Sequence, residues 1–146
     1  MHVATVLKRK GSNVVSVTPD KTIEEAVTVL SENHIGAALV LDSPDSVCGI
    51  FSERDIIYGL ATHGADIMTG RVETLMSRDV HLCSPKDTIA SVMNVMTQQR
   101  IRHLPVVEDG KLLGVISIGD VVKQRLIDTE LDLETLRDYA SIRADE

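Results

Sequence analysis

Two pairs of side chains in this 146-residue sequence combine a hydroxyl with a carboxylate at the same spacing. Ser52 stands three residues before Asp55, and Ser117 stands three residues before Asp120. Each carboxylate is expected at a helix N-terminus, where it can cap the helix. The same oxygens can accept hydrogen bonds from the vicinal hydroxyls of a ribose, and the free N–H groups of a helix start suit a phosphate. Capping and binding of a sugar phosphate both fit these residues.

Basic residues near the two pairs add positive charge that the chain otherwise lacks. Arg54 lies between Ser52 and Asp55, and Arg102 and His103 precede an apolar run of the second half. Arginine suits phosphate because its planar guanidinium is permanently charged and donates several hydrogen bonds. The alternative for each arginine is a solvated surface charge.

The two pairs belong to an internal duplication. The segment Thr18–Ile23 returns as Ser84–Ile89, 66 residues later, and Gly49–Asp55 returns as Gly114–Asp120, 65 residues later. Any site that the chain builds is therefore expected in two related copies. Neither half alone would bury much surface, so we expect the halves to be fused.

Each half is predicted to contain a helix, two strands and a second helix. Apolar residues at helical spacing predict a helix over 22–33, and Ile89, Val92, Met93 and Met96 repeat the pattern. Thr22 and Glu25 predict a capping box. Apolar runs at 37–41, 47–51, 104–107 and 112–117 predict strands. A tight turn is predicted at Asp109-Gly110 and a longer loop over 42–46, and the last helix of each half should open at Asp55 or Asp120. The fold class is α+β.

These elements divide the chain into five parts: an N-terminal segment 1–14, a first repeat 15–61, a connector 62–79 with a short helix at 72–76, a second repeat 80–127, and a C-terminal helix extension 128–146. The extension carries a seam spaced like the core of a coiled coil. Its residues are Val122, Leu126, Thr129, Leu133, Leu136 and Ala140. The seam fits packing on its own domain and packing on a second copy equally well.

Composition disfavours several functions. A net charge of −7 with one Phe and two Tyr disfavours nucleic-acid binding, which favours a basic face or stacking aromatics. No apolar run approaches the ~20 residues of a membrane span, and no signal sequence is evident, so we expect a cytoplasmic protein without membrane contact. Cys48 and Cys83 read as buried thiols more readily than as a disulfide. The five scattered histidines predict no metal site.

The duplicated pattern resembles a tandem pair of cystathionine-β-synthase (CBS) domains, known as a Bateman module, of the stand-alone bacterial type that acts in signal transduction. The residues that carry this resemblance are Gly114-Val-Ile-Ser-Ile-Gly-Asp120, Phe51-Ser-Glu-Arg-Asp55 and Arg100–Gly110. They belong to repeats that cover about residues 15–60 and 80–127. The resemblance implies two pseudo-symmetric βαββα-type repeats in one module. It also implies a sensor of AMP, ADP, ATP or NAD without a catalytic cofactor, which forms homodimers and acts through an unknown regulated protein.

The resemblance further implies two clefts that mix residues of both repeats, with Asp55 and Asp120 as the ribose contacts. Site one would contain Thr18, Ile23, Arg102, His103, Ser117 and Asp120. Site two would contain Gly36, Ala37, Ser52, Arg54, Asp55, Ser84 and Ile89. Because small residues replace Arg102 and His103 in site two, the sites should differ in affinity or preferred ligand. Two departures, Leu39 opposite Pro105 and Gly119 opposite Arg54, leave phosphate number and base selectivity open.

Two other functions compete with this interpretation. CBS pairs are inserted in inosine-monophosphate dehydrogenases, but this sequence has no room for the ~250-residue barrel of such an enzyme and contains no Gly-x-Ser-x-Gly, Walker or His-Glu-x-x-His motif. We therefore expect no enzymatic activity. The other alternative is a structural dimerisation module with vestigial clefts, in which the Ser and Asp residues serve only as caps.

Overall fold

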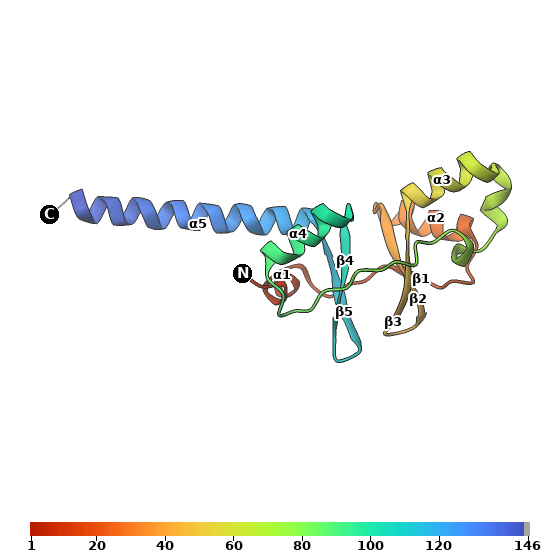
Figure 1. Ribbon diagram of the computed structural model, residues 1–146, viewed down its shortest axis with the longest axis horizontal. Helices are drawn as coiled ribbons and strands as arrows, with labels where there is room; N and C mark the ends of the chain where they lie inside the picture. Colours follow the sequence, from red (N-terminus) through yellow and green to blue (C-terminus); the bar gives the residue numbers. More distant parts are fainter. Residues whose placement is uncertain (145–146) are drawn as a thin grey trace.

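The computed structural model describes residues 1–144 as two similar α+β halves side by side (Figure 1). The first half contains β1 (Ser16–Val17), α2 (Ile23–Glu32), β2 (Ala37–Ser43), β3 (Ser46–Ser52) and α3 (Glu53–His63). The second contains α4 (Ile89–Gln99), β4 (His103–Glu108), β5 (Lys111–Ser117) and α5 (Ile118–Ala144). Helix α1 (Val3–Lys10) precedes both halves, and the 3-10 turns η1 (Ala65–Thr69) and η2 (Val72–Thr74) lie between them. The predicted order of elements within each repeat is confirmed.

Helices α2 and α4 begin with equivalent threonine caps. The Thr22 hydroxyl oxygen accepts a hydrogen bond from the Glu25 N–H at 3.1 Å, and Thr88 does the same for Ser91 at 3.1 Å. The reciprocal half of the predicted capping box differs, because the Glu25 carboxylate accepts from the Thr22 hydroxyl at 3.1 Å. Both helices bury the apolar face that the sequence indicated.

The strands form two small sheets. In the first, β1 runs parallel to β2, which pairs antiparallel with β3; in the second, β4 and β5 form an antiparallel hairpin that Cys83 joins by a parallel bridge to Val106. Asp109 and Gly110 have φ of 52° and 75°, as the predicted tight turn requires. The prediction of a longer loop over 42–46 was wrong, because β2 continues to Ser43 and β3 begins at Ser46.

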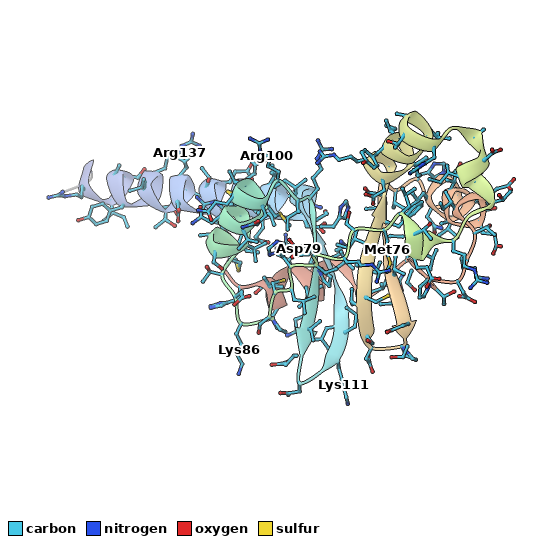
Figure 2. The ribbon with its side chains drawn as sticks, turned by 45° about the vertical axis from the view of Figure 1, so that its right-hand side comes forward. Met76, Asp79, Lys86, Arg100, Lys111 and Arg137 are labelled. Carbon is cyan, nitrogen blue, oxygen red and sulfur yellow. The ribbon has the colours of Figure 1, made fainter. Side chains whose placement is uncertain are left out.

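Each half has its own apolar core. Helix α1, which precedes the first half, completes the core of the second half, and residues 72–76, which precede the second half, complete the core of the first. Val3 and Val6 of α1 are buried with α4, β4 and β5, whereas Val72 and Met76 are buried with α2, β2 and β3. The exchange is nearly symmetric: the Ile89 N–H donates to the Met1 carbonyl at 3.0 Å, and the Ile23 N–H donates to the Gly70 carbonyl at 2.9 Å. Figure 2 shows the connector near Met76 and Asp79 passing between the halves.

Two segments differ from their predictions. The helix predicted at 72–76 is only the 3-10 turn Val72–Thr74, and residues 1–14 contain a helix that the sequence analysis did not predict. Cys48 and Cys83 are free thiols, and burial raises the pKa of Cys83 to about 12. Cys83 is therefore protonated and unreactive at neutral pH.

Helix α5 begins on the second half and extends far beyond it (Figure 1). Val121 and Gln124 are fully buried, but every residue from 129 to 143 is exposed. The seam of this helix therefore does not pack on its own domain, which removes one of the two interpretations left open above. No helix in residues 1–144 is both long and apolar enough to cross a membrane.

Candidate functional site

Ser117 and Asp120 form a capping box at the start of α5. The Ser117 N–H and hydroxyl each donate to Asp120 Oδ2 at 2.9 Å, and the Asp120 N–H donates to Ser117 Oγ at 3.2 Å. Ser52 and Asp55 make the same box at the start of α3. The helices thus begin at Ile118 and Glu53, two residues before the expected Asp positions. Each box leaves one Asp oxygen without a partner in its own motif.

The Asp120 carboxylate also pairs with Lys10, the last residue of α1. Lys10 Nζ lies 2.6 Å from Asp120 Oδ2 and donates to the Val115 carbonyl at 2.8 Å. Burial alone would raise the pKa of Asp120, but hydrogen bonds from Lys10 and Ser117 outweigh it and hold the pKa below its usual value. Asp120 is therefore an anionic acceptor at neutral pH, and a cation from a distant part of the sequence lies against it.

A cavity of about 260 Å³, called the Asp120 cleft below, lies beside this pair and between the two halves; Lys10 and Ser117, which both donate to Asp120, line it. Leu39, Ile50 and Val115 form part of an apolar wall, to which the first half contributes only apolar residues, whereas the polar groups come from the N-terminal segment and the second half. The polar lining residues are Lys10, Asn13, His103 and Ser117. An apolar wall with a few polar groups is typical of small-molecule sites.

His103 lines this cavity as a neutral side chain rather than a cation. Its pKa is lowered by burial and by the nearby charges of Lys10 and Arg102, against the opposing effect of Asp120. The prediction that His103 adds positive charge was therefore wrong. Arg102 is exposed, and its carbonyl accepts the Ile118 N–H at 2.8 Å. Lys10 supplies the positive charge in contact with Asp120.

The surroundings of Asp55 have a different electrostatic character from those of Asp120. Asp55 Oδ2 accepts from the Ser52 N–H at 3.0 Å and the Ser52 hydroxyl at 3.1 Å, and Oδ1 accepts from the Ser77 hydroxyl at 3.1 Å. Neutral hydroxyl and amide donors thus surround this carboxylate, where Asp120 has an ammonium. Arg54, which was expected to contribute charge here, is exposed.

The structure groups the remaining expected site residues differently. Ala37 pairs with Ser52 in the first sheet yet also lines the Asp120 cavity, and the Gly36 carbonyl accepts the Glu53 N–H at 2.9 Å. Ile23 and Ile89 are buried in the two cores. The hydroxyl oxygen of Ser84 accepts a hydrogen bond from the Lys86 N–H at 3.2 Å.

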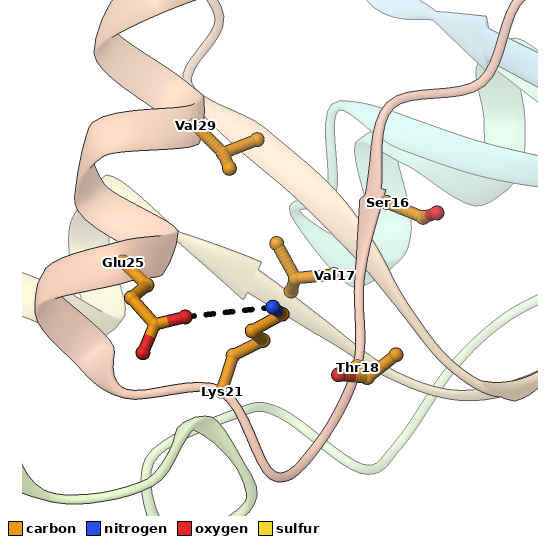
Figure 3. A pocket seen from close by; sticks show the side chains of 6 residues that line it. All are labelled: Ser16, Val17, Thr18, Lys21, Glu25 and Val29. Carbon is orange, nitrogen blue, oxygen red and sulfur yellow. Dashed lines mark ion pairs between the residues drawn. The ribbon is translucent and has the colours of Figure 1, made fainter.

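Thr18 lines a separate hollow of about 210 Å³ between β1 and α2 (Figure 3). Lys21 and Glu25 form an ion pair across it at 3.5 Å, and the Thr18 hydroxyl donates to Asp20. Sequence reasoning missed Lys10, Asn13 and Ser77. Lys10 stands in a visible run of basic residues, but no periodicity or repeat connects that run with Asp120.

Comparison with known proteins identifies the fold. The family model described as "CBS domain" matches residues 5–62 and 72–126. A CBS-domain-containing protein of Agrobacterium tumefaciens is 44% identical, with 86% of this chain and 99% of that chain covered and a TM-score of 0.82. A CBS domain protein of Pyrobaculum aerophilum, solved in complex with AMP, is 28% identical over 91% of this chain and 99% of that chain, with a TM-score of 0.76.

An inosine-5'-monophosphate dehydrogenase of Methanocaldococcus jannaschii is 30% identical over 77% of this chain, but the match covers only 22% of that enzyme. The similarity is therefore confined to a small part of the dehydrogenase. The first matched segment contains most of α1 and nearly all of the first half, and the second contains η2 and the second half as far as Leu126 of α5. This chain belongs to the CBS domain family, and its two repeats form a Bateman module.

Proposed function

We propose that this chain is a regulatory module that binds an adenine nucleotide in the Asp120 cleft and acts through a partner protein. The candidate ligands are AMP, ADP, ATP and NAD. The observation that carries this proposal is the anionic Asp120 carboxylate beside a partly apolar cavity built from both repeats and α1. The AMP bound to the Pyrobaculum relative supports the ligand class.

In this proposal the ligand exchanges places with Lys10 at the carboxylate. The ribose hydroxyls donate to Asp120, and the adenine lies against the apolar side chains of Leu39, Ile50 and Val115. Lys10, released from Asp120, then pairs with the phosphate as an ammonium–phosphate contact. The cavity of about 260 Å³ is just below the ~300–1,000 Å³ of small-molecule sites, and withdrawal of the Lys10 side chain enlarges it.

The two clefts are proposed to differ in preference for charged ligands. Lys10 gives the Asp120 cleft a cation that can pair with the phosphate. At Asp55, the equivalent hydrogen bond comes from the neutral hydroxyl of Ser77. A nucleotide with more phosphate charge should therefore favour the Asp120 cleft. The roles expected for Ser52, Arg54, Ser84 and the other site-two residues remain part of this proposal.

The signal is proposed to leave the module through α1 and through association. Displacement of Lys10 releases the C-terminal end of α1, which a regulated partner can detect. A homodimer is the proposed functional unit, because exposed apolar side chains, including Ile57 and Tyr58 on α3 and Val122 and Leu126 on α5, lie on the helices of both repeats. We propose a regulatory role without catalysis, since the dehydrogenase relative shares only a small part of its length with this chain.

Calorimetry and thermal unfolding with adenosine, AMP, ADP, ATP and NAD test the ligand proposal. A ligand at 100 times its dissociation constant should stabilise the fold by about 2.7 kcal/mol. GMP at equal concentration controls for non-specific anion binding. No binding by any of the adenine ligands would reject the sensor function and favour a structural dimerisation module.

A further inference from the structure

The face of α5 that carries the seam points away from the body of the protein. Val121 and Gln124 are fully buried on one side of the helix, while Val122 and Leu126 are 45% and 61% exposed. The seam continues outward through Leu133 and Leu136, which are also exposed. A long helix with such a stripe gains most of its stability from packing against another surface.

The seam residues occupy the core positions of a coiled-coil heptad repeat. Leu126, Leu133 and Ala140 take position a, and Val122, Thr129 and Leu136 take position d. Most of these side chains are aliphatic, and every residue from 129 to 143 is exposed. The available surface therefore has the spacing of a two-helix interface.

The charges that flank the seam distinguish the two possible orientations of a second helix. Arg125 and Asp132 occupy position g, and Glu130 and Arg137 occupy position e. In a parallel pair, each g residue faces the e residue five positions further along the other helix. Arg125 then faces Glu130 of the partner subunit, and Asp132 faces Arg137 of the partner subunit. Both pairs are attractive and occur twice by symmetry.

An antiparallel pair with the same core overlap places like charges together. Its centre falls near residue 131, so that Leu126 packs on Leu136 of the partner subunit. The e positions then bring Glu130 against Glu130 of the partner subunit, and the g positions bring Asp132 against Asp132 of the partner subunit. Adjacent like charges disfavour this arrangement.

We propose that α5 of a second copy of this chain packs on this seam in parallel and in register, as a two-stranded coiled coil over residues 122–140. This inference rests on the homodimer proposed above and specifies its geometry. The four charges that form these pairs are all exposed, and Arg137 projects from the part of α5 that lies beyond the body (Figure 2). A parallel pair is a closed symmetric contact, so assembly stops at the dimer.

Cysteine cross-linking in the full chain tests the orientation. In a parallel pair, position 129 faces itself across the axis, so Thr129→Cys should form a covalent dimer in glutathione redox buffer. Thr135→Cys is a matched control on the opposite face of the helix, because both threonine hydroxyls donate to the carbonyl four residues earlier at 2.9 Å. The unaltered chain, with Cys48 and Cys83, is the blank. We expect Thr129→Cys alone to dimerise covalently.

Sedimentation tests whether the seam is the face of α5 that forms the interface. Leu133→Glu places charge in the seam and should weaken association by about tenfold or more. Leu131→Glu is its control, since Leu131 is 52% exposed, Leu133 is 49% exposed and only Leu133 lies on the seam. Circular dichroism of both variants checks that α5 remains helical.

Different outcomes overturn different parts of the proposal. A monomeric unaltered chain at tens of micromolar rejects the homodimer, without affecting the nucleotide titrations. A dimer in which Thr129→Cys cross-links only to a Leu133→Cys chain shows an antiparallel pair. Equal cross-linking of both threonine variants, or equal weakening by both glutamates, rejects the seam while the homodimer stands.

Discussion

Lys10 Nζ lies 2.6 Å from Asp120 Oδ2, although the two residues are 110 positions apart in the sequence. The contact joins the last residue of α1 to the first turn of α5, because α1 packs on the second repeat. The helix that completes the core of this repeat therefore also sets the charge of its cleft. Occupancy of the cleft and position of α1 are linked through one ion pair.

Replacing Lys10 by Met should weaken binding of AMP but not of adenosine. Loss of a charge-assisted contact to phosphate removes about 1.5 kcal/mol, roughly tenfold in affinity. Adenosine carries no phosphate and gains access to Asp120 without displacing the lysine. Calorimetry measures both ligands, and Lys8→Met, an exposed change on the same helix, is the control. If both ligands bind more tightly to Lys10→Met, Lys10 is only a competitor for Asp120.

Asp120→Asn should reduce affinity for adenosine and AMP alike. Its ribose contacts are charge-assisted hydrogen bonds, which contribute about 1.5–3 kcal/mol each before water compensates. The change also weakens the helix cap, at a cost of about 1 kcal/mol in the free energy of unfolding. Thr88→Ala, which removes the cap of α4 without altering a proposed ribose contact, is the matched control. Equal affinity in Asp120→Asn and the unaltered chain would limit Asp120 to capping.

The stability of the fold should fall on mild acidification because of His103. Its pKa is lowered in the folded state, so the unfolded chain binds more protons below the ordinary value of 6.5. The stabilising contribution is therefore present above pH 6.5 and is lost as pH falls through the folded pKa. Denaturant unfolding across this range should show a steeper loss for the unaltered chain than for His103→Gln. His63→Gln, on the exposed end of α3, should retain the steeper loss.

Gly49→Ala should destabilise the protein more than Gly114→Ala, although the two glycines are equivalent in the repeats. A Cβ at Gly49 would lie 2.9 Å from the Ser77 carbonyl oxygen, which is backbone and cannot turn aside. A Cβ at Gly114 would meet the end of the Leu7 side chain at 3.0 Å, and that side chain can move. We expect about 1–3 kcal/mol for Gly49→Ala and less for Gly114→Ala. Thermal unfolding of the pair decides it, and equal losses would contradict the prediction.

Much of each repeat was predictable because its determinants are local. Apolar spacing located α2 and α4, Asp109-Gly110 located a hairpin, and the Ser–Asp spacing located two helix starts. Signals of this kind depend on residues a few positions apart. The first hairpin was the exception, since Pro44 and Asp45 alone connect the strands there.

The cleft was less predictable because its charge depends on distant contacts. Lys10 reaches Asp120 only after α1 packs on the second repeat, and no spacing in the sequence encodes that exchange. The state of His103 likewise depends on burial and on Lys10, so residue type alone suggested a cation. An interpretation that treats each repeat alone misses the contacts that α1 makes with the second repeat and that residues 72–76 make with the first.

Helix α1 completes the second core and residues 72–76 complete the first, so the two cores form in a fixed order during synthesis. Val72 follows the first repeat directly, so that core can close as soon as the connector has been made. Val3 is made first but shares a core with Val121, 118 positions later. Helix α1 must therefore remain without its partner until the second repeat leaves the ribosome. The Asp120 cleft is thus the last part of the module to mature, and a nascent chain cannot respond to ligand there before the start of α5 has left the ribosome.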